Sequence, residues 1–262
     1  MSDRRVLVVG ACGRMGEQVR KWVLAHDELE LAEALEAHEH PRIGEEISPG
    51  VNLADDPQRS LAQADVAIDF TTPAATLSTL RLAAEAGVPY VTGTTGFSPV
   101  ESEELAQLAE RVAVIHAPNF SLSVNVLAWL TRQAAEKLGD DFDAELFEIH
   151  HSAKRDAPSG TALFLAESVA RGRGIELADH LILERSGETG PRPDGTIGIQ
   201  TLRGGNNPGE HTVYFVGDGE RLELVHRSAT RDHFARGAVR CAAWLIGRPP
   251  GLYSVDSVYG LD

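Results

Sequence analysis

The start of the chain places three elements in an order that strongly limits the fold. Residues 5–9 are apolar and mostly β-branched, which predicts a short buried strand. A turn with three glycines follows at residues 10–16, and residues 15–23 then repeat apolar side chains at helical spacing. Strand, glycine turn and helix in this order are typical of the first unit of an open, mostly parallel α/β sheet.

The glycine turn suits the binding of a dinucleotide. Its sequence is G-x-x-G-x-x-G, with Cys12 where the usual dinucleotide fingerprint has its second glycine. Gly13 can still bring the backbone close to a pyrophosphate, and Gly16 can still allow the helix to pack closely on the strand. A glycine-rich turn alone is also typical of an ordinary structural turn, so this motif does not decide the function.

A carboxylate stands where a dinucleotide's ribose would need one. The second predicted strand, residues 29–35, leads directly to Glu36, which could accept hydrogen bonds from the adenine-side ribose diol of NADH. Glu33 is the alternative if the strand is shorter. A neighbouring arginine would favour the 2′-phosphate of NADPH, but the neighbour is Ala37.

The alternation of strands and helices continues to residue 121. Further strands are expected at residues 66–70, 89–92 and 112–115, and loops after the last two should lie at the edge where such sheets bind ligands. We expect these loops to face the nicotinamide half of a cofactor, although Phe97 and Phe120 are equally suited to packing. The polar stretch between residues 37 and 63 contains His38 and His40, but no third ligand has a matching spacing, so no metal site is expected.

Beyond residue 121 the pattern changes to strands in succession. Ser121 is a candidate cap for a long helix, and a helical pattern near the end of the chain is expected to return to the first domain. Asp218-Gly219 is a strong hairpin signal. We therefore predict a Rossmann-like domain (residues 1–121 and 231–262) and a smaller α+β domain (residues 122–230). The smaller domain should have a mostly antiparallel sheet, one face of which another subunit could cover. Its strands are expected at residues 145–149, 196–202, 211–216 and 222–226.

Residues 148–162 carry the most chemistry in the chain. His150 and His151 can gain or lose a proton near neutral pH, and Lys154 adds an ammonium. Ser159 is a candidate helix cap, and the free amides of a helix start, next to Gly160, would suit a carboxylate or phosphate. The segment suits an anionic substrate that must receive a proton. The alternative is a charged turn before an ordinary helix.

Composition excludes several classes of protein. The formal net charge of −15 argues against nucleic acid and anionic lipid as partners, and no apolar run is long enough to span a bilayer. The chain begins without the apolar core of a signal peptide, and Cys12 and Cys241 offer no disulfide framework. We expect a cytoplasmic protein with reduced thiols.

Four stretches together resemble a known family. The glycine turn, residues 93–97, residues 117–121 and the H-H-x-x-K-x-D-x-P-S-G-T-A run from His150 occur in the order found in the 4-hydroxy-tetrahydrodipicolinate reductases, also called dihydrodipicolinate reductases. The resemblance covers nearly the whole chain. Its last motif is highly specific, whereas the glycine turn is not.

The resemblance implies an NAD(P)H-dependent oxidoreductase of the diaminopimelate route to lysine, which converts 4-hydroxy-tetrahydrodipicolinate to tetrahydrodipicolinate. By match to the family motif, it implies that His150 is the general acid/base and Lys154 the proton donor. It further implies that His151, Gly160 and Thr161 hold the carboxylates of the small dicarboxylate substrate, and that the second domain's sheet assembles a homotetramer. NADH and NADPH are the implied cofactors. The implied cofactor contacts are Gly10, Ala11, Cys12, Gly13, Arg14, Met15, Glu36, Gly93, Thr94, Thr95, Ala117, Pro118, Asn119 and Phe120.

Three other functions are compatible with parts of the pattern. A dehydrogenase of the same architecture, acting on an aspartate- or homoserine-type substrate, would share the glycine turn without requiring His150, His151 and Lys154. A regulator that binds NAD(H) without turnover would not need titratable clusters in the second domain. A metal-dependent hydrolase using both histidines is disfavoured because adjacent side chains on an extended segment point in opposite directions.

Overall fold

The computed structural model describes residues 4–230 and 232–261, and the chain divides into two compact units. The first unit contains residues 1–121 and 232–262, and the second contains residues 122–231. Arg231, where we expected the return to the first domain, lies outside the described residues. Each unit has its own sheet and its own apolar core. No helix in the described part of the chain is long and apolar enough to cross a membrane.

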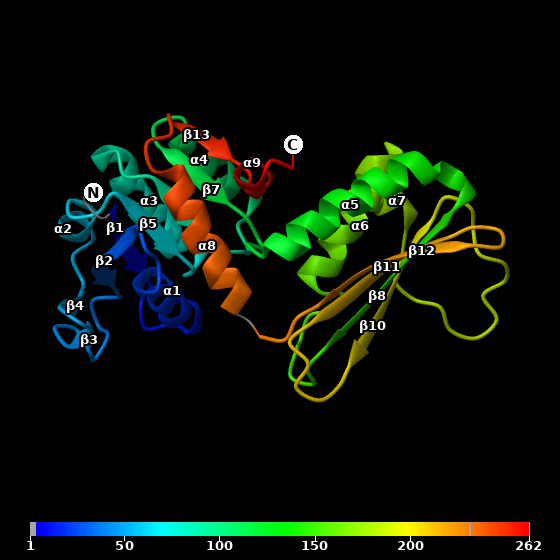
Figure 1. Ribbon diagram of the computed structural model, residues 1–262, viewed down its shortest axis with the longest axis horizontal. Coiled ribbons are helices and arrows are strands. Elements are labelled where there is room, and N and C mark those ends of the chain that lie inside the picture. Colours follow the sequence, from blue (N-terminus) through cyan, green and yellow to red (C-terminus); the bar gives the residue numbers. More distant parts are fainter. Residues whose placement is uncertain (1–3, 231, 262) are drawn as a thin grey trace. The chain divides into compact units, whose positions relative to one another are not determined.

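The first unit is built on an eight-stranded sheet in the order β13-β7-β6-β5-β1-β2-β4-β3 (Figure 1). Its neighbouring strands pair in parallel except β3 and β4, which are antiparallel. The predicted α/β class with a Rossmann-like sheet is confirmed. The strands are β1 (Arg4–Val9), β2 (Leu29–Leu35), β3 (Glu46–Ser48), β4 (Val51–Ala54), β5 (Val66–Asp69), β6 (Tyr90–Thr92), β7 (Ala113–His116) and β13 (Gly251–Tyr253).

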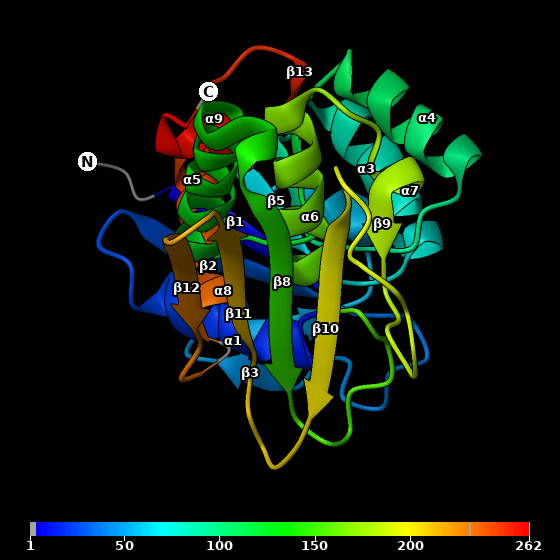
Figure 2. The ribbon, with the colours of Figure 1, turned by 90° about the vertical axis from the view of Figure 1, so that its right-hand side faces the viewer.

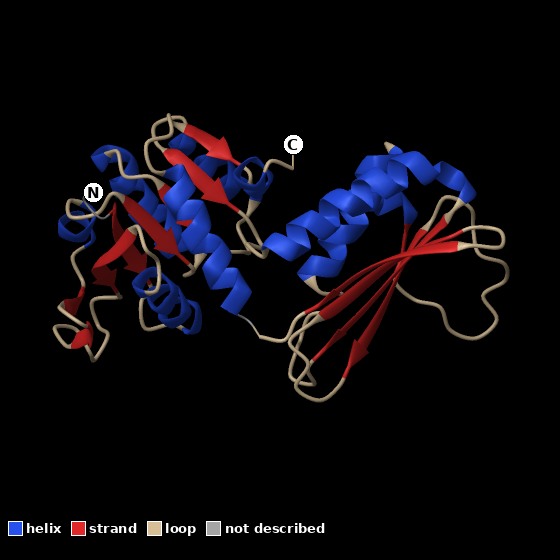
Figure 3. Cartoon of the chain, in the orientation of Figure 1, coloured by secondary structure: helices blue, strands red, loops and turns tan. Residues whose placement is uncertain are grey.

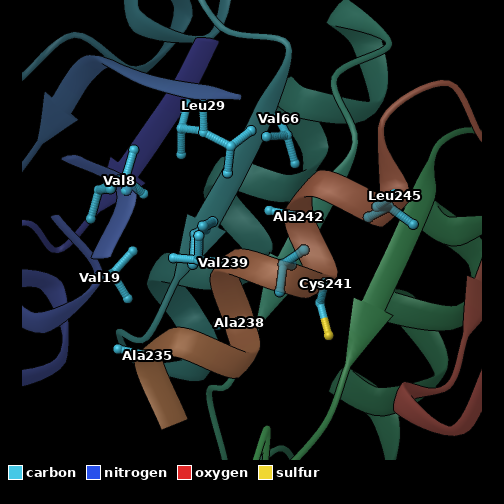
Figure 4. Close-up of a cluster of buried hydrophobic side chains, with 14 of the residues drawn as sticks. Val8, Val19, Leu29, Val66, Ala235, Ala238, Val239, Cys241, Ala242 and Leu245 are labelled. Carbon is cyan, nitrogen blue, oxygen red and sulfur yellow. The ribbon is translucent and has the colours of Figure 1, made fainter. Parts of the chain in front are cut away.

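Helices cover both faces of this sheet because its central strands are apolar on both sides. Val6 and Val8 of β1 belong to one buried cluster, whereas Leu7 and Val9 belong to another, as the two-residue period of a strand requires. Figure 4 shows the first cluster, in which strand side chains meet α8. The helices of this unit are α1 (Arg14–Leu24), α2 (Pro57–Leu61), α3 (Pro73–Ala86), α4 (Pro99–Ala109), α8 (Asp232–Leu245) and α9 (Val255–Tyr259).

The second unit has a mixed sheet, which corrects the expectation of a mostly antiparallel one. Its strand order is β12-β11-β8-β10-β9, and β10 is parallel to both β8 and β9 (Figure 2). The chain passes from β8 through α6 before it forms β10, and a helical crossover returns the chain so that the next strand runs in the same direction. Only β11 pairs antiparallel, with β8 and with β12. The strands are β8 (Asp143–His150), β9 (Leu181–Ile182), β10 (Ile197–Arg203), β11 (Glu210–Val216) and β12 (Arg221–Arg227).

Two long helices pack on one face of this sheet (Figure 3). Leu165 and Val169 of α6 meet the inward residues Leu146, Val213 and Phe215 in a buried cluster. The alternation along β8 fixes which side chains point inward, so His150 lies on the covered face. The helical elements are α5 (Leu122–Leu138), η1 (Gly139–Asp141), α6 (Gly160–Arg173) and α7 (Leu177–His180).

Gly237 of α8 packs closely on Phe120, in the loop that follows β7, and this contact allows a test of stability. A Cβ added at Gly237 would lie 1.8 Å from the carbonyl oxygen of Phe120, so Gly237→Ala must displace backbone. Overpacking typically costs about 1–3 kcal/mol, which exceeds the gain of up to about 1 kcal/mol in helix propensity. We expect Gly237→Ala to lower the free energy of unfolding by about 2 kcal/mol. Thermal melting checks this, with Gly204→Ala as a control, because a methyl there would stand in open space. An unchanged melting temperature would contradict the prediction.

Candidate active site

The loops predicted to hold a cofactor leave one edge of the first sheet. Strands β1, β2, β6 and β7 are parallel, so their carboxyl ends meet at the same edge. The glycine turn follows β1, Glu36 follows β2, and residues 93–95 and 117–120 follow β6 and β7. The fold therefore brings together, at one edge, the segments that the sequence analysis selected.

The glycine turn has the close backbone packing of a pyrophosphate-binding turn. Gly10 has a left-handed φ of +67°, and a Cβ added at Gly16 would lie 2.1 Å from the carbonyl oxygen of Gly10. Gly13 is the N-cap of α1 and brings no side chain to the helix start. A helix start without a covering side chain presents backbone amides and the positive end of the helix dipole to an anion. The turn therefore fits a dinucleotide's phosphates despite Cys12.

Glu36 lies against this turn, whereas Glu33 does not. The carboxylate of Glu36 accepts hydrogen bonds from the amide of Cys12 (3.1 Å) and from the amide of Ala37 (3.2 Å). Glu33 instead accepts a bond from the hydroxyl of Ser60 at 3.0 Å. The geometry favours Glu36 as the carboxylate for a ribose diol.

The two other loops contribute buried and exposed residues. Thr94 is buried and bonded through its hydroxyl to Thr76 (2.8 Å), whereas Thr95 and Pro118 are exposed. Phe120 is buried with its ring against Phe70, at a centroid distance of 5.7 Å. The ring of Phe120 is therefore a packing group, so a ligand would meet its backbone. Ala117 and Asn119 are also buried.

His38 and His40 have different partners. His38 Nδ1 lies 2.5 Å from the carboxylate of Asp55, whereas His40 lies with Cys12 and Glu36 in a group whose potential ligand atoms are all within 4.8 Å of one another. Zinc accepts these donors, but it needs a thiolate. Burial and the charge of Glu36 raise the pKa of the Cys12 thiol. The structure thus brings Cys12 and Glu36 to His40, a grouping that the spacing along the chain did not predict, and the absence of a metal stays a prediction.

The second unit holds a charged network around His150, the last residue of β8. Glu148, two residues earlier and on the same face, places Oε2 2.5 Å from Nδ1 of His150. Its carboxylate also accepts bonds from both terminal nitrogens of Arg203, each at 2.9 Å. Burial alone would raise the pKa of Glu148, but the bonds from His150 and Arg203 lower the pKa to about 2. Glu148 is therefore a buried anion at neutral pH.

A second histidine packs on His150. The ring of His211 stands edge-on to that of His150 at a centroid distance of 5.1 Å, and its Nε2 lies 3.0 Å from the hydroxyl of Ser159. Burial, together with the charge of His150, lowers the pKa of His211 to about 3. His211 is therefore a neutral ring at physiological pH.

Lys154 is paired within its own segment. Its Nζ lies 2.8 Å from both carboxylate oxygens of Asp156, which lowers the pKa of Asp156. The side chain of Lys154 is 19% exposed, so the protein covers most of its surface. A pocket of about 440 Å³ opens beside this segment, and its lining includes His151. The other lining residues are Ser152, Ala153, Gly205, Asn206 and Pro208.

The start of α6 has the predicted cap. The hydroxyl of Ser159 accepts the amide of Ala162 at 3.1 Å, and the amide of Ser159 bonds to Glu148 at 3.1 Å. Gly160 is exposed, and a Cβ there would stand in open space. Thr161, in the first turn, is partly exposed. The helix start is therefore open to an anion, and it shares Glu148 with His150.

Sequence reasoning missed four residues around His150. Glu148 was noted only as the start of its segment, although its spacing of two from His150 on a strand already places both on one face. Arg203 and His211 come from β10 and β11, which only the sheet register brings to His150. Gly209 is needed because a Cβ there would lie 2.7 Å from Nε2 of His150.

The Rossmann-like unit with its glycine turn and the charged histidine cluster of the second unit fit a nicotinamide-dependent oxidoreductase. Comparison with known families makes this specific. Residues 4–120 match the model of the dihydrodipicolinate reductase N-terminus, and residues 123–259 match that of its C-terminus. The chain belongs to the dihydrodipicolinate reductase family.

Individual relatives support the same assignment. A 4-hydroxy-tetrahydrodipicolinate reductase from Anaeromyxobacter dehalogenans is 48% identical and one from Anaeromyxobacter sp. is 50% identical, with 98% of this chain and 98% and 97% of the relatives covered. The structure of a dipicolinate-bound dihydrodipicolinate reductase from Paenisporosarcina sp. superposes with a TM-score of 0.77 at 25% identity, covering 96% of this chain and 97% of that one. An amine dehydrogenase from Mycobacterium smegmatis, at 18% identity and a TM-score of 0.61 (97% and 96% covered), shares the fold.

The neutral state of His211 predicts a pH dependence of stability. The unfolded chain binds a proton at a histidine below about pH 6.5, whereas folded His211 does so only near pH 3. Between about pH 3 and pH 6.5, the unfolded chain therefore binds a proton at this histidine that the folded chain does not bind. The free energy of unfolding falls as the pH falls through this range, by up to about 1.4 kcal/mol per pH unit. When the pH is lowered from 6.5 to 5, we expect the free energy of unfolding to drop by about 2 kcal/mol more in the wild type than in His211→Gln. Denaturant titrations at several pH values test this, and parallel pH curves for the two proteins would refute it.

Proposed function

We propose that this protein reduces 4-hydroxy-tetrahydrodipicolinate to tetrahydrodipicolinate with NADH or NADPH, and that His150 and Lys154 handle the protons of the reaction. The observation that carries the assignment of roles is the network at the end of β8. There a buried carboxylate holds the imidazole of His150, and Arg203 links that carboxylate to the segment that contains Lys154. The family relationship supplies the substrate and the reaction. One water leaves the substrate, and one hydride and one proton are added.

Lys154 is proposed to donate the proton that accompanies the hydride, which the nicotinamide cofactor supplies when bound. Its Nζ lies 2.8 Å from both carboxylate oxygens of Asp156, and these bonds orient the ammonium. His150 is proposed to act as the general acid/base through Nε2, because its other nitrogen is engaged by Glu148. Gly209 lies against Nε2, and a Cβ at this position would approach that nitrogen to 2.7 Å.

The substrate's two carboxylates need positive partners. We assign one to the start of α6 at Gly160 and Thr161, where helix amides and the helix dipole favour an anion. His151, which lines the 440 Å³ pocket, is assigned to carboxylate binding as well. The structure of the Paenisporosarcina reductase is of a protein bound to dipicolinate, a planar dicarboxylate, which supports this class of ligand.

The cofactor is assigned to the carboxyl edge of the first sheet. The glycine turn, from Gly10 to Met15, would hold the pyrophosphate, and Glu36 the adenine-side ribose. Residues 93–95 and 117–120 would line the nicotinamide side. A cytoplasmic location and a homotetramer are further parts of this proposal.

An activity assay tests the function and the role of Lys154 together. The wild type, given freshly made synthase product, should oxidise NADH or NADPH, with the reaction followed by cofactor absorbance. Lys154→Ala should lower kcat by about 10²-fold or more with nearly unchanged cofactor affinity, because the proton donor is lost while the first unit is untouched. Lys137→Ala, which removes an exposed lysine of the same unit, should keep wild-type kcat. An inactive wild type would overturn the function, whereas near-wild-type kcat in Lys154→Ala would overturn only the role.

The pair Glu36-Ala37 predicts cofactor preference. Glu36 gains bonds from the ribose diol of NADH but meets a like charge when the 2′ oxygen carries phosphate. We expect kcat/KM for NADH to be at least equal to that for NADPH. Ala37→Arg should shift the ratio about tenfold toward NADPH, or ~1.4 kcal/mol, whereas Ala37→Gln should not, because it adds length without charge. Both ratios are measured at fixed ionic strength. A wild-type preference for NADPH of tenfold or more would show that Glu36 does not discriminate.

The uncovered face of the second sheet predicts the oligomer. The face opposite α5 and α6 carries the apolar side chains of Phe147, Ile149, Leu202 and Val225. Leu202 pairs with Ile149 across β10 and β8 and is 50% exposed. Such an apolar face is typical of a subunit interface. Light scattering at micromolar concentration should give the mass of a tetramer, and Leu202→Asp should lower that mass. A monomer mass for the wild type would contradict the proposal.

A further inference from the structure

We propose that Glu148, clamped by Arg203, is the positioning residue that fixes which nitrogen of His150 carries the proton and that couples His150 to the substrate-binding start of α6. This inference rests on the proposed function and extends it to Glu148 and Arg203, two residues to which no direct contact with the substrate is assigned. Glu148 acts through its neighbours, since its side chain is completely buried.

The carboxylate of Glu148 is bonded on both oxygens by groups from three segments. Oε2 lies 2.5 Å from Nδ1 of His150 and 2.9 Å from Nη1 of Arg203. Oε1 accepts the amide of Ser159 at 3.1 Å, the hydroxyl of Thr201 at 3.2 Å and Nη2 of Arg203 at 2.9 Å. A carboxylate bonded in this way has little freedom to rotate, so its geometry fixes that of its neighbours.

Arg203 provides the charge that lets Glu148 stay ionised in the interior. Its guanidinium meets the carboxylate as a two-pronged fork, and its side chain is only 20% exposed. An isolated buried carboxylate would take up a proton instead. Arg203 also donates to the carbonyl of Asp156 at 2.7 Å, which ties the segment containing Lys154 to the same network.

An ionised carboxylate can only accept hydrogen bonds, so it selects one form of His150. The neutral ring must place its proton on Nδ1, facing Glu148, and leave the lone pair on Nε2. Nε2 is also the nitrogen beside Gly209, where a Cβ would approach to 2.7 Å. Glu148 therefore leaves the lone pair on the nitrogen that lies against Gly209, a position where only a residue without a side chain fits.

The other oxygen of the same carboxylate holds the helix that binds substrate. Because the amide of Ser159 bonds to Oε1, the first turn of α6, with Gly160 and Thr161, is placed relative to His150 by one rigid group. One carboxylate therefore orients the acid/base residue and the site assigned to the substrate's carboxylate.

Glu145 provides a matched control on the same strand. It too is paired with two guanidinium groups, Arg185 at 2.6 and 2.7 Å and Arg192 at 2.8 Å, but it lies three residues away on the opposite face. Glu145→Gln removes a carboxylate of the same kind without touching His150. A merely structural role for Glu148 would make the two glutamine variants alike.

The test reads the proton on His150 directly. Nitrogen NMR of protein labelled with ¹⁵N-histidine distinguishes the two neutral ring forms, and signals lost in His150→Gln assign the ring. Above the range in which the ring is charged, the wild type and Glu145→Gln should show the proton on Nδ1. In Glu148→Gln, the amide can donate to Nδ1, so the proton should move to Nε2 and kcat should fall about 10²-fold or more.

The outcomes separate this inference from the proposed function. A wild-type ring with its proton on Nε2 would overturn the inference even if Glu148→Gln does not fold. A folded Glu148→Gln with the proton still on Nδ1, or with the kcat of Glu145→Gln, would also overturn it. Turnover by the wild type is measured in the same preparation, so an inactive wild type with the proton on Nδ1 would count against the proposed function alone. A shifted proton together with lost kcat, confined to the position of Glu148, would support the inference.

Discussion

The need to keep one carboxylate ionised in the protein interior organises the second unit. Glu148 is fully buried, and Arg203 meets it at the end of the neighbouring strand β10. That contact requires β8 and β10 to be parallel and in register, because Arg203 pairs directly with His150 across the two strands. The chain crosses over through α6, so β10 runs in the same direction as β8. Ser159, the N-cap of α6, also bonds to Glu148. The topology of the sheet therefore places the groups that surround Glu148.

The first unit handles a buried carboxylate differently. Asp69, at the end of β5, is also fully buried, and it accepts bonds from the hydroxyl of Tyr90 (3.0 Å) and the amide of Thr71 (2.8 Å). Burial raises the pKa of Asp69, whereas the bonds from His150 and Arg203 lower that of Glu148. The donors to Asp69 are neutral groups, which tie the loop after β5 to the end of that strand. Glu148 is bonded instead by the guanidinium of Arg203 and lies beside the imidazole of His150.

Much of the fold and part of the site could be predicted from the sequence. The α/β class followed from apolar runs that alternate with helical periods, since a strand covered on both faces leaves a continuous apolar signature. The mixed second sheet was not predicted, because period-two patterns are the same in parallel and antiparallel strands and carry no direction. The roles assigned to His150, Lys154 and the cofactor residues stay predictions, although the fold gathers each set at one place.

The sequence by itself determined which residues could carry chemistry, and where the helix after the His150 segment began. Ser159 caps α6 as its local sequence predicts, and Glu36 follows β2 directly, because caps and strand ends are set by neighbours along the chain. Only the tertiary structure decided which distant groups meet them. Arg203 lies 55 residues after Glu148, and the choice of Glu36 over Glu33 depends on contact with the glycine turn. Such contacts come from strand pairing and crossover direction, which are properties of the packed sheet and leave no local pattern in the sequence.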